Sequence, residues 1–391
     1  MGPLRVNLWL LRRKISASPY RSFLLASTTV LCMAYMGVFT HLAEKDYHTE
    51  FSYPLDIDLR EARSLSVQPI NTFNHTYLKP CVDKCSSGQV PRLLVVIKSA
   101  LPHFDRRSAI RKTWGYEKRF SDVPIRTVFL LGTTTDPESQ LLVDREDSEH
   151  GDIVQSDFHD HYGNNTLKTM SGLKWAVEFC STASFVVFSD DDMYLSIKNL
   201  LIFLRNPSSY PDEAASEDQL SNEDPLMPSI PNANTDHRER SLKQEKPDDD
   251  SPLQGNWDEA QDLKLYAGYV FHSPPLRHRT SKWYVSLAEY PYHLWPPYVT
   301  AGAYVLSRSA LLDLHYGSAY TQYFRFDDVF LGLVARKASI QPLHCPHFYF
   351  WKKPYSSSNP RSYRHVIASH GFHDPTELVH VWSRQKSAGY A

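Results

Sequence analysis

"FVVFSDDDMY", residues 185–194, places three consecutive aspartates directly after an apolar run. Such a run predicts a buried strand, so Asp190, Asp191 and Asp192 stand at its carboxyl end. Adjacent carboxylates repel one another and lose hydration beside an apolar strand, which costs free energy unless a cation or hydrogen-bond donors compensate. A divalent metal such as Mn2+ or Mg2+ would compensate, and an acidic surface turn is the alternative interpretation.

Similar apolar runs recur along the chain and alternate with helical patterns. The predicted strands cover 93–97, 127–132, 185–190, 265–271 and 298–307, and the predicted helices cover 105–114, 166–180 and 197–205. This alternation predicts an α/β fold, a sheet flanked by helices. In an open α/β sheet, ligands collect at the carboxyl ends of the strands, where the three aspartates are expected to lie.

A second acidic pair, Asp327 and Asp328, stands in "FRFDDVFLG", residues 324–332, before a helical apolar pattern. Acids at a helix N-terminus complement the helix dipole and cap free N–H groups, so the pair has a structural interpretation. The functional interpretation is a general base, held at a rigid helix start beside a substrate hydroxyl.

An aromatic stretch covers residues 278–307. Aromatic rings stack on the C–H faces of sugars, which makes Trp283, Tyr284 and Trp295 candidates for acceptor binding, although most buried aromatic residues are simply core. Gly302 is a further candidate, because a backbone without a side chain allows a ligand to approach closely.

Basic residues follow the first predicted strand. These are Arg106, Arg107, Arg111 and Lys112, which could hold a nucleotide diphosphate, with Arg107 and Arg111 as our candidates for donor binding. A solvated helix face is the alternative. The formal net charge of −2 gives no sign of a nucleic-acid partner, which usually requires a strongly basic domain.

Residues 22–43 form an uncharged, mainly apolar stretch that is long enough, as a helix, to cross a bilayer. Basic residues precede it at Arg12, Arg13, Lys14 and Arg21. By the positive-inside rule, residues 1–21 are predicted to be a cytoplasmic tail, 22–43 a transmembrane signal-anchor, and the remainder luminal. A cleaved signal peptide and a buried soluble helix are the alternatives.

The luminal part is predicted to consist of a stem, residues 44–90, and a catalytic domain, residues 91–391. Within the domain, residues 212–262 are acidic and poor in core-forming residues, which predicts a disordered insertion. The sequons at Asn74 and Asn164 are candidates for glycosylation.

Four cysteines fall on the predicted luminal side, namely Cys81, Cys85, Cys180 and Cys345. They permit two disulfides in any of three connectivities. A zinc site at Cys81 and Cys85 is the alternative for that close pair.

In their order along the chain, "RRSAIRKTWG", "DFHDHYGNNTLKTMSGLKWA", "FSDDDMY" and "FRFDDVFLG" resemble motifs of the β-1,3-glycosyltransferases of family 31, often named the galactosyltransferase family. The resemblance covers roughly residues 91–383, apart from the acidic insertion. Within the family, the motifs are most similar to those of the brainiac-type β-1,3-N-acetylglucosaminyltransferases. The resemblance implies a GT-A fold (a Rossmann-like mixed sheet flanked by helices), a type II protein of the Golgi membrane, a UDP-sugar donor and Mn2+ or Mg2+.

The resemblance also implies roles for individual residues. Asp190 and Asp192 match the DxD positions as metal and donor ligands, with Asp191 between them at the donor. Asp328 matches the catalytic base, and Asp327 stands where the family commonly has a glutamate. A histidine is expected to complete the metal site. His347 is our candidate, and His344 and His370 are also possible.

The implied reaction inverts the anomeric centre and moves a sugar, GlcNAc in our interpretation, from UDP-GlcNAc to the 3-hydroxyl of a glycan. The acceptor implied is a membrane glycosphingolipid such as mannosyl-glucosyl-ceramide. UDP-Gal with a glycolipid or glycoprotein acceptor is the alternative within the family. Two other classes are a metal-dependent luminal lectin without catalysis and a metal-dependent phosphohydrolase.

Overall fold

The computed structural model describes residues 19–52, 68–86, 88–211 and 264–391. The strands are β1 (Tyr77–Lys79), β2 (Leu93–Lys98), β3 (Ile125–Thr133), β4 (Ile153–His159), β5 (Phe185–Asp190), β6 (Tyr194–Leu195), β7 (Tyr266–Phe271), β8 (Tyr298–Ser307), β9 (Leu343–His344), β10 (Phe348–Tyr349) and β11 (Ala368–Ser369). The α-helices are α2 (Pro19–Tyr35), α3 (Val38–His41), α4 (Tyr47–Glu50), α6 (Phe104–Lys112), α7 (Pro137–His150), α8 (Asn165–Phe179), α9 (Ile197–Arg205), α11 (Arg308–Ala319), α12 (Asp327–Lys337) and α13 (Pro375–Ser387). The acidic insertion predicted at 212–262 lies outside the described residues.

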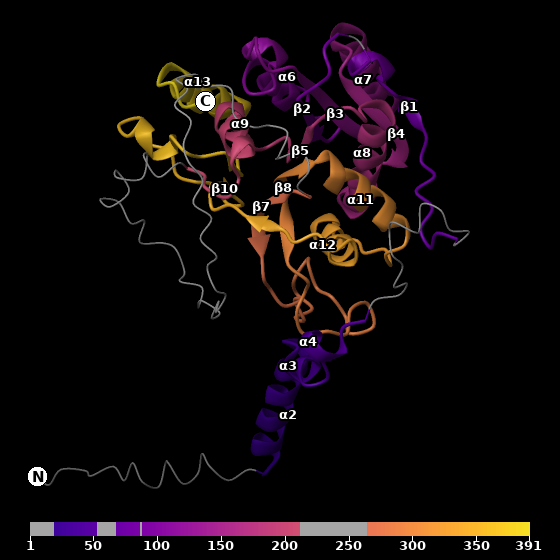
Figure 1. Ribbon diagram of the computed structural model, residues 1–391. Coiled ribbons are helices and arrows are strands. Elements are labelled where there is room, and N and C mark those ends of the chain that lie inside the picture. The colour runs from indigo at the N-terminus through magenta and orange to yellow at the C-terminus, as the bar shows by residue number, and fades with distance from the viewer. Residues whose placement is uncertain (1–18, 53–67, 87, 212–263) are drawn as a thin grey trace, which may run out of the picture.

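Within the described residues, eight strands form one mixed sheet in the order β1-β4-β3-β2-β5-β8-β7-β9 (Figure 1). Strands β4, β3, β2 and β5 are parallel to one another, whereas β8 runs antiparallel to both β5 and β7. The short strands β10, β11 and β6 form a second sheet. The predicted mixed α/β architecture is therefore confirmed.

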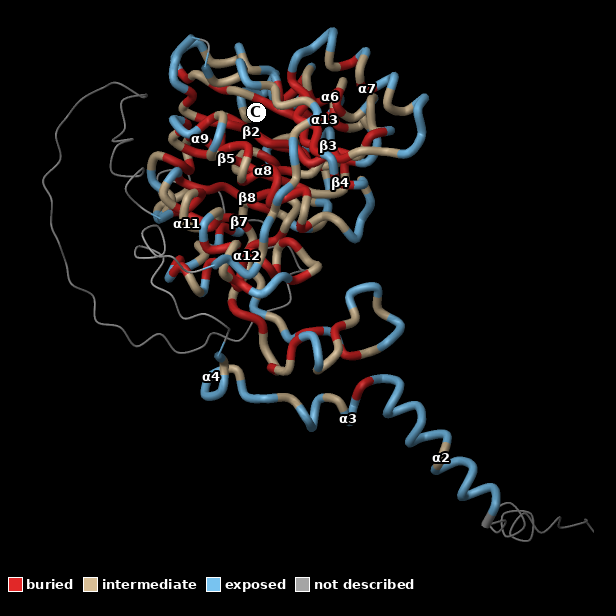
Figure 2. Tube along the Cα trace, turned by 90° about the vertical axis from the view of Figure 1, so that its right-hand side faces the viewer, coloured by how far each residue is buried: buried red, intermediate tan, exposed pale blue. Residues whose placement is uncertain are grey.

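Helices cover both faces of the large sheet. One core contains apolar residues of α8, α11 and α12, and the other contains residues of α6, α9 and α13. Helix α9 illustrates why these segments are helical: Leu200, Leu201 and Leu204 recur at helical spacing, and Ser196 caps the first turn by accepting from the Asn199 N–H. The buried residues accordingly concentrate between the layers (Figure 2).

The side on which the chain adds strands to the sheet switches between β2 and β5. From β2 the chain builds β3 and then β4 on one side, and afterwards returns to place β5 on the other side. Ligands of open α/β sheets bind at such a switch point, outside the carboxyl ends of the two strands. Lys98 and Asp190, which end β2 and β5, are partners in the register. The three aspartates therefore follow directly at the switch point.

The N-terminal helix differs from the predicted single span over 22–43. Helix α2 covers 17 residues and ends before Gly37, whose φ of 81° is left-handed. A side chain at Gly37 would meet the Arg277 carbonyl oxygen at 2.6 Å, so the chain can turn this closely only at glycine. Among the described residues, no helix has both the length and the apolar character needed to cross a membrane. Helix α2 points away from the sheet (Figure 1), and its apolar side chains, among them Phe23 and Leu25, are exposed.

Parts of residues 44–90, predicted as a stem, contact the domain. Glu44 forms a buried ion pair with Arg277, with 2.7 Å between Oε1 and Nε. Strand β1 pairs antiparallel with β4 and so extends the large sheet. The short strand has few apolar residues, and its pairing with β4 depends on contacts far away in sequence.

The predicted luminal cysteines form one disulfide among the described residues, Cys85–Cys180. It attaches the segment after β1 to the residue that follows α8. Cys81 and Cys345 are free thiols, and burial raises the pKa of Cys345 to about 12. The zinc alternative for Cys81 and Cys85 is not borne out in the described part of the chain, because Cys85 is bonded to Cys180.

Replacing both Cys85 and Cys180 by Ala is expected to lower the free energy of unfolding by about 2–4 kcal/mol, since the bond spans 95 residues of the unfolded chain. Urea unfolding of the variant and the parent would measure the difference. Reductant should then shift the parent curve and leave the variant unchanged. Equal stability of the two proteins would contradict the expectation.

Candidate active site

Lys98, the last residue of β2, lies between two carboxylates from distant parts of the chain. Its Nζ atom is 3.0 Å from Oδ1 of Asp190 and 2.9 Å from Oδ2 of Asp327. Asp327 also accepts a 2.7 Å hydrogen bond from the Thr169 hydroxyl. Burial alone would lower the pKa of Lys98, but the two carboxylates raise it well above its ordinary value, so the ammonium stays charged. Lys98 therefore joins the two acidic motifs into one site.

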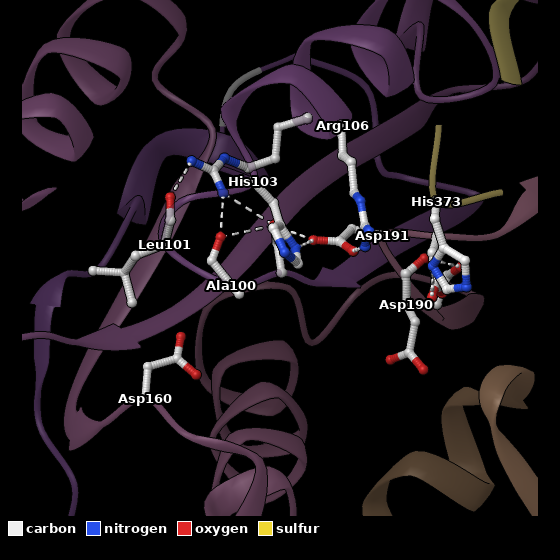
Figure 3. Close-up of polar contacts among 12 residues, drawn as sticks. Ala100, Leu101, His103, Arg106, Asp160, Asp190, Asp191 and His373 are labelled. Atoms are coloured by element: carbon white, nitrogen blue, oxygen red, sulfur yellow. Dashed lines mark hydrogen bonds and ion pairs between the residues drawn. The ribbon is translucent and has the colours of Figure 1, made fainter. Parts of the chain in front are cut away.

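Asp191 is held by donors from the segment after β2. It accepts from the Ser99 hydroxyl at 2.6 Å and from Nη1 of Arg106 at 2.9 Å, and its Oδ2 lies 2.7 Å from Nδ1 of His103. Figure 3 shows His103 and Arg106 both directed at this carboxylate. Burial opposes ionisation, yet these contacts hold the pKa of Asp191 below its usual value. Its carboxylate thus fixes the loop between β2 and α6 at the switch point.

Asp192 faces two histidines from the segment after β11. Its Oδ2 atom is 3.1 Å from Nδ1 of His373 and 3.5 Å from Nε2 of His370. The contact with Asp192 raises the pKa of His370. In the part of the chain that the structure describes, the second oxygen of Asp192, Oδ1, is buried without a hydrogen-bond partner. A buried carboxylate oxygen that accepts no hydrogen bond is suited to bind a cation.

The predicted metal ligands are only partly brought together. No group of three or more His, Cys, Asp or Glu side chains within the described ranges is arranged to hold a metal ion. Asp190 is paired with Lys98, so Asp192 carries the unpartnered oxygen. Carboxylate oxygen suits Mn2+ or Mg2+, and imidazole nitrogen adds affinity for a transition metal, which favours Mn2+. Asp192, His370 and His373 have donor atoms of the types that suit such a metal, but in the described part of the chain they are not arranged as a three-ligand group.

His347, our predicted third ligand, lies elsewhere. Its ring packs against those of Tyr210 and His365, with centroids 5.3 and 6.1 Å away. Burial lowers the pKa of His347 to about 4, so its imidazole is neutral. The structure therefore does not bring His347 into the contact that His370 and His373 make with Asp192.

Asp328 is the second residue of α12 and follows Asp327 directly. Burial and repulsion from the Asp327 carboxylate together raise the pKa of Asp328 to about 7. Asp327, in contrast, keeps a lowered pKa despite its burial, because Lys98 and Thr169 stabilise its charge. Of the two predicted catalytic acids, Asp328 can exchange a proton near neutral pH, whereas Asp327 is engaged in the ion pair with Lys98.

Arg107 and Arg111 have structural partners. Arg107 is fully buried and donates to both carboxylate oxygens of Glu146. Arg111 makes two 2.8 Å bonds to Asp152 and one of 2.7 Å to Glu146. Both guanidinium groups thus fix α6 against α7 and the start of β4, which differs from the predicted role in donor binding. The arginine that contacts the aspartate triplet is Arg106.

The predicted acceptor aromatics are spread over different environments. Trp295 is a core residue, with its ring centroid 3.9 Å from that of Tyr290. Trp283 is 47% exposed, and its indole N–H donates to the Tyr162 hydroxyl. Tyr284 is half-buried beside them in sequence. Of these three, Trp283 is the residue available at the surface.

Gly302 lies on β8 beside the metal-ligand candidates. A Cβ atom at this position would meet Sδ of Met193 at 3.3 Å and the ring of His370 at 3.9 Å. The glycine therefore lies where β8 passes close to Met193 and His370, and its role in acceptor binding stays a prediction.

The two sequons differ in exposure. Asn74 is exposed, whereas Asn164 is half-buried and donates to the His159 carbonyl at 2.8 Å. The threonine of the second sequon, Thr166, is buried and donates to the Phe324 carbonyl. Glycosylation of both positions stays a prediction.

Sequence reasoning missed Lys98, Ser99, His103 and His373. The lysine that ends "LLVVIK" was a detectable signal, since an apolar strand rarely ends in a buried cation without a partner. The two histidines carried no such signal, because their positions depend on loops that fold back onto the sheet.

A family model described as Galactosyltransferase matches residues 105–243 and 251–346. The protein "Beta-1,3-galactosyltransferase brn" of Drosophila melanogaster is 41% identical over 369 residues, which cover 94% of this chain and 96% of the relative. "Beta-1,3-galactosyltransferase 1" of Mus musculus is 29% identical over 324 residues, covering 83% and 82%. Among solved structures, the apo form of the bifunctional glycosyltransferase WbbM gives a TM-score of 0.35 at 12% identity, covering 77% of this chain and 53% of that one.

Open α/β sheets bind their ligands at the switch point, which is where these acidic side chains gather. The position of the site is therefore that of an α/β enzyme whose ligand binds at the carboxyl ends of the strands. The chain belongs to the galactosyltransferase family, the family 31 β-1,3-glycosyltransferases. The predicted family and the resemblance to its brainiac-type members are confirmed.

Proposed function

We propose that this chain is an inverting β-1,3-hexosyltransferase of GT-A fold, which moves GlcNAc from UDP-GlcNAc to the 3-hydroxyl of a membrane glycolipid. The observation that carries the proposal is the position of Lys98, which joins Asp190 at the end of β5 to Asp327 at the start of α12. This contact brings Asp328, with a pKa of about 7, beside the aspartates at the switch point.

In the proposed reaction, the Asp328 carboxylate accepts the proton of the acceptor 3-hydroxyl. The oxygen then attacks the anomeric carbon on the face opposite to UDP, and the electron pair of the breaking C1–O bond leaves with the diphosphate. An α-linked donor therefore gives a β-linked product. A general base is most effective when its pKa lies near the working pH, which suits Asp328 better than Asp327.

Asp192, His370 and His373 would hold the metal. Mn2+ bound there would neutralise charge on the UDP leaving group. Arg106 and His103 bind Asp191 in this structure, and they keep the loop after β2 in position for the nucleotide. Together these residues would hold the donor so that its anomeric carbon faces Asp328.

A second candidate function is β-1,3-galactosyl transfer from UDP-Gal to a glycolipid or glycoprotein. It is supported by the names of both relatives, which are β-1,3-galactosyltransferases. A metal-dependent luminal lectin is the candidate without catalysis.

We further propose a type II orientation in the Golgi membrane, with residues 22–43 as the anchor and the domain in the lumen. The exposed apolar side chains of α2 support this proposal, since a row of such residues is costly in water. Anchoring would confine the enzyme to the surface that carries a lipid-linked acceptor, and so raise their effective concentration.

The experiment that tests the proposal is an incubation of the purified chain with UDP-GlcNAc or UDP-Gal and a set of glycolipid acceptors. Transfer with Mn2+, its loss with a chelator and its recovery on adding Mn2+ back are expected. Acceptor binding without transfer from either donor would favour the lectin and contradict the proposal.

The raised pKa of Asp328 predicts the pH dependence of transfer. The base works when ionised, so kcat/KM should rise about tenfold per pH unit below pH 7 and become constant above it. The same raised pKa means that the folded state binds the proton more tightly. The contribution of Asp328 to the free energy of unfolding should therefore decrease as the pH rises from about 4 to above 7. A pH–rate profile with its midpoint near 4 would contradict this assignment.

A further inference from the structure

Four aromatic side chains that the proposed reaction does not use gather beside the end of β7, and we call them the aromatic platform: Tyr269, Phe271, Phe350 and Trp351. The Phe350 ring centroid lies 4.7 Å from those of Tyr269 and Phe271 and 4.4 Å from that of Trp351. Tyr269 and Trp351 are 5.5 Å apart. Strand β10, which precedes Phe350 in the chain, contacts β7 (Figure 1). The cluster thus combines two residues of β7 with the two residues that follow β10, which are far apart in the sequence.

The platform lies at the surface. Phe350 is 38% exposed, and the other three side chains are of intermediate exposure. Apolar rings that stay in contact with water cost free energy, and a contiguous group of them usually marks a binding surface. The four platform side chains carry no formal charge, which favours a neutral ligand over the UDP diphosphate.

One end of the platform adjoins the base. Phe271 stacks on Tyr298 with centroids 5.7 Å apart. Helix α12 approaches Tyr298 so closely that a Cβ atom at Gly332 would lie 2.5 Å from the Tyr298 Cβ. Asp328 precedes Gly332 by one helical turn and so lies on the same face of α12. Burial and the Asp328 charge together raise the pKa of Tyr298 to about 12.

The other end adjoins the metal-ligand candidates. The Tyr349 carbonyl accepts a 3.1 Å hydrogen bond from the backbone N–H of His370, and Phe350 is the next residue. Strands β5 and β7 end at the same edge of the sheet, because β8 runs antiparallel to both. The platform therefore lies at the edge that carries the aspartate triplet, between His370 and Asp328.

We infer that the aromatic platform binds the acceptor, with the C–H face of a pyranose ring stacked on Phe350 and Trp351. Aromatic faces complement the apolar face of a sugar, and this surface borders the base that must reach the acceptor hydroxyl. The donor diphosphate belongs at the switch point between β2 and β5, on the other side of β8. The inference rests on the proposed function and adds an acceptor site outside residues 278–307.

Phe350→Ala and Trp351→Ala variants of the full chain test the inference, with methyl β-D-mannopyranoside and methyl β-D-galactopyranoside as acceptors. Each variant is expected to raise the acceptor KM about tenfold, which corresponds to about 1.4 kcal/mol from a lost aromatic contact. The KM for the UDP-sugar should not change. Tyr116→Ala is the matched control. Tyr116 is also an exposed aromatic residue, but it follows the C-terminal end of α6, whereas the N-terminal end of α6 is the one beside Asp191.

An unchanged acceptor KM, or an equal rise in the donor KM, would overturn the inference. A loss confined to lipid-linked acceptors would also overturn it, since it would assign the platform to an acyl chain. If Phe350→Ala does not fold, Phe350→Leu keeps an apolar side chain without the ring and should give the same rise.

Failure of the proposed function can be distinguished from failure of this inference. If the parent chain transfers no sugar, saturation-transfer NMR of the two methyl glycosides measures binding directly. Binding that is lost in Phe350→Ala and kept in Tyr116→Ala supports the platform, and equal binding by both contradicts it.

Discussion

Replacing Asp328 by Asn is expected to lower kcat by about 10²–10⁴, the usual contribution of general base catalysis. Asparagine keeps the size and hydrogen-bonding reach of aspartate but cannot accept the acceptor proton. The proposed donor site is made of other residues, so the affinity for UDP with Mn2+ should stay within about twofold, as measured by calorimetry. Activity and UDP affinity together distinguish loss of the catalytic base from damage to the proposed donor site.

The structural interpretation of Asp328 predicts another result. Asn is about as good at a helix N-terminus as Asp, so a residue with only this role would tolerate the change. Asp328→Asn should be at least as stable to heat as the parent protein, since the change removes the repulsion between Asp328 and Asp327. A variant with near-normal kcat would refute the assignment of Asp328 as the base.

Replacing Lys98 by Met should lower the free energy of unfolding by about 3–5 kcal/mol, the usual cost of removing one partner of a buried ion pair. Asp190 and Asp327 would remain close together without the cation between them. Lys352→Met is the matched control, because its pair with Glu377 is on the surface and should contribute at most about 1 kcal/mol. Urea unfolding measures both differences.

A second substitution tests whether uncompensated carboxylate charge causes the loss of stability in Lys98→Met. Adding Asp327→Asn to Lys98→Met removes one of the two uncompensated charges, so part of the lost stability should return. If Lys98→Met is as stable as Lys352→Met, or if the second change gives no recovery, Lys98 does not hold the two acidic motifs together.

Much of the fold follows from local patterns. The runs at 185–190 and 298–307 coincide with β5 and β8, since a continuous apolar β-branched run has few alternatives in a buried sheet. The triplet was predicted to stand at the carboxyl end of a strand, and it does so at the end of β5, where Asp190 is in register with Lys98 of β2. Strand β4 was missed because "IVQSDFH" mixes polar and apolar residues.

The composition of the site depended on contacts between distant residues. Lys98 and Asp327 are 229 positions apart, and no local pattern connects them. Arg107 and Arg111 were interpreted as donor ligands because basic residues after the first strand suit a diphosphate, yet Glu146 and Asp152 bind them. The sequence could not choose His370 over His347 and His344 for the same reason: its contact with Asp192 depends on the loop after β11.

NMR of the product formed from a soluble acceptor and UDP-GlcNAc or UDP-Gal reports both the linkage and the anomeric configuration of the transferred sugar. We predict that the parent protein forms a β-linked sugar on the 3-hydroxyl of the acceptor, and that Asp328→Asn forms it at least about 10²-fold more slowly. An α-linked product, a linkage to another hydroxyl, or equal rates for the two proteins would contradict this prediction.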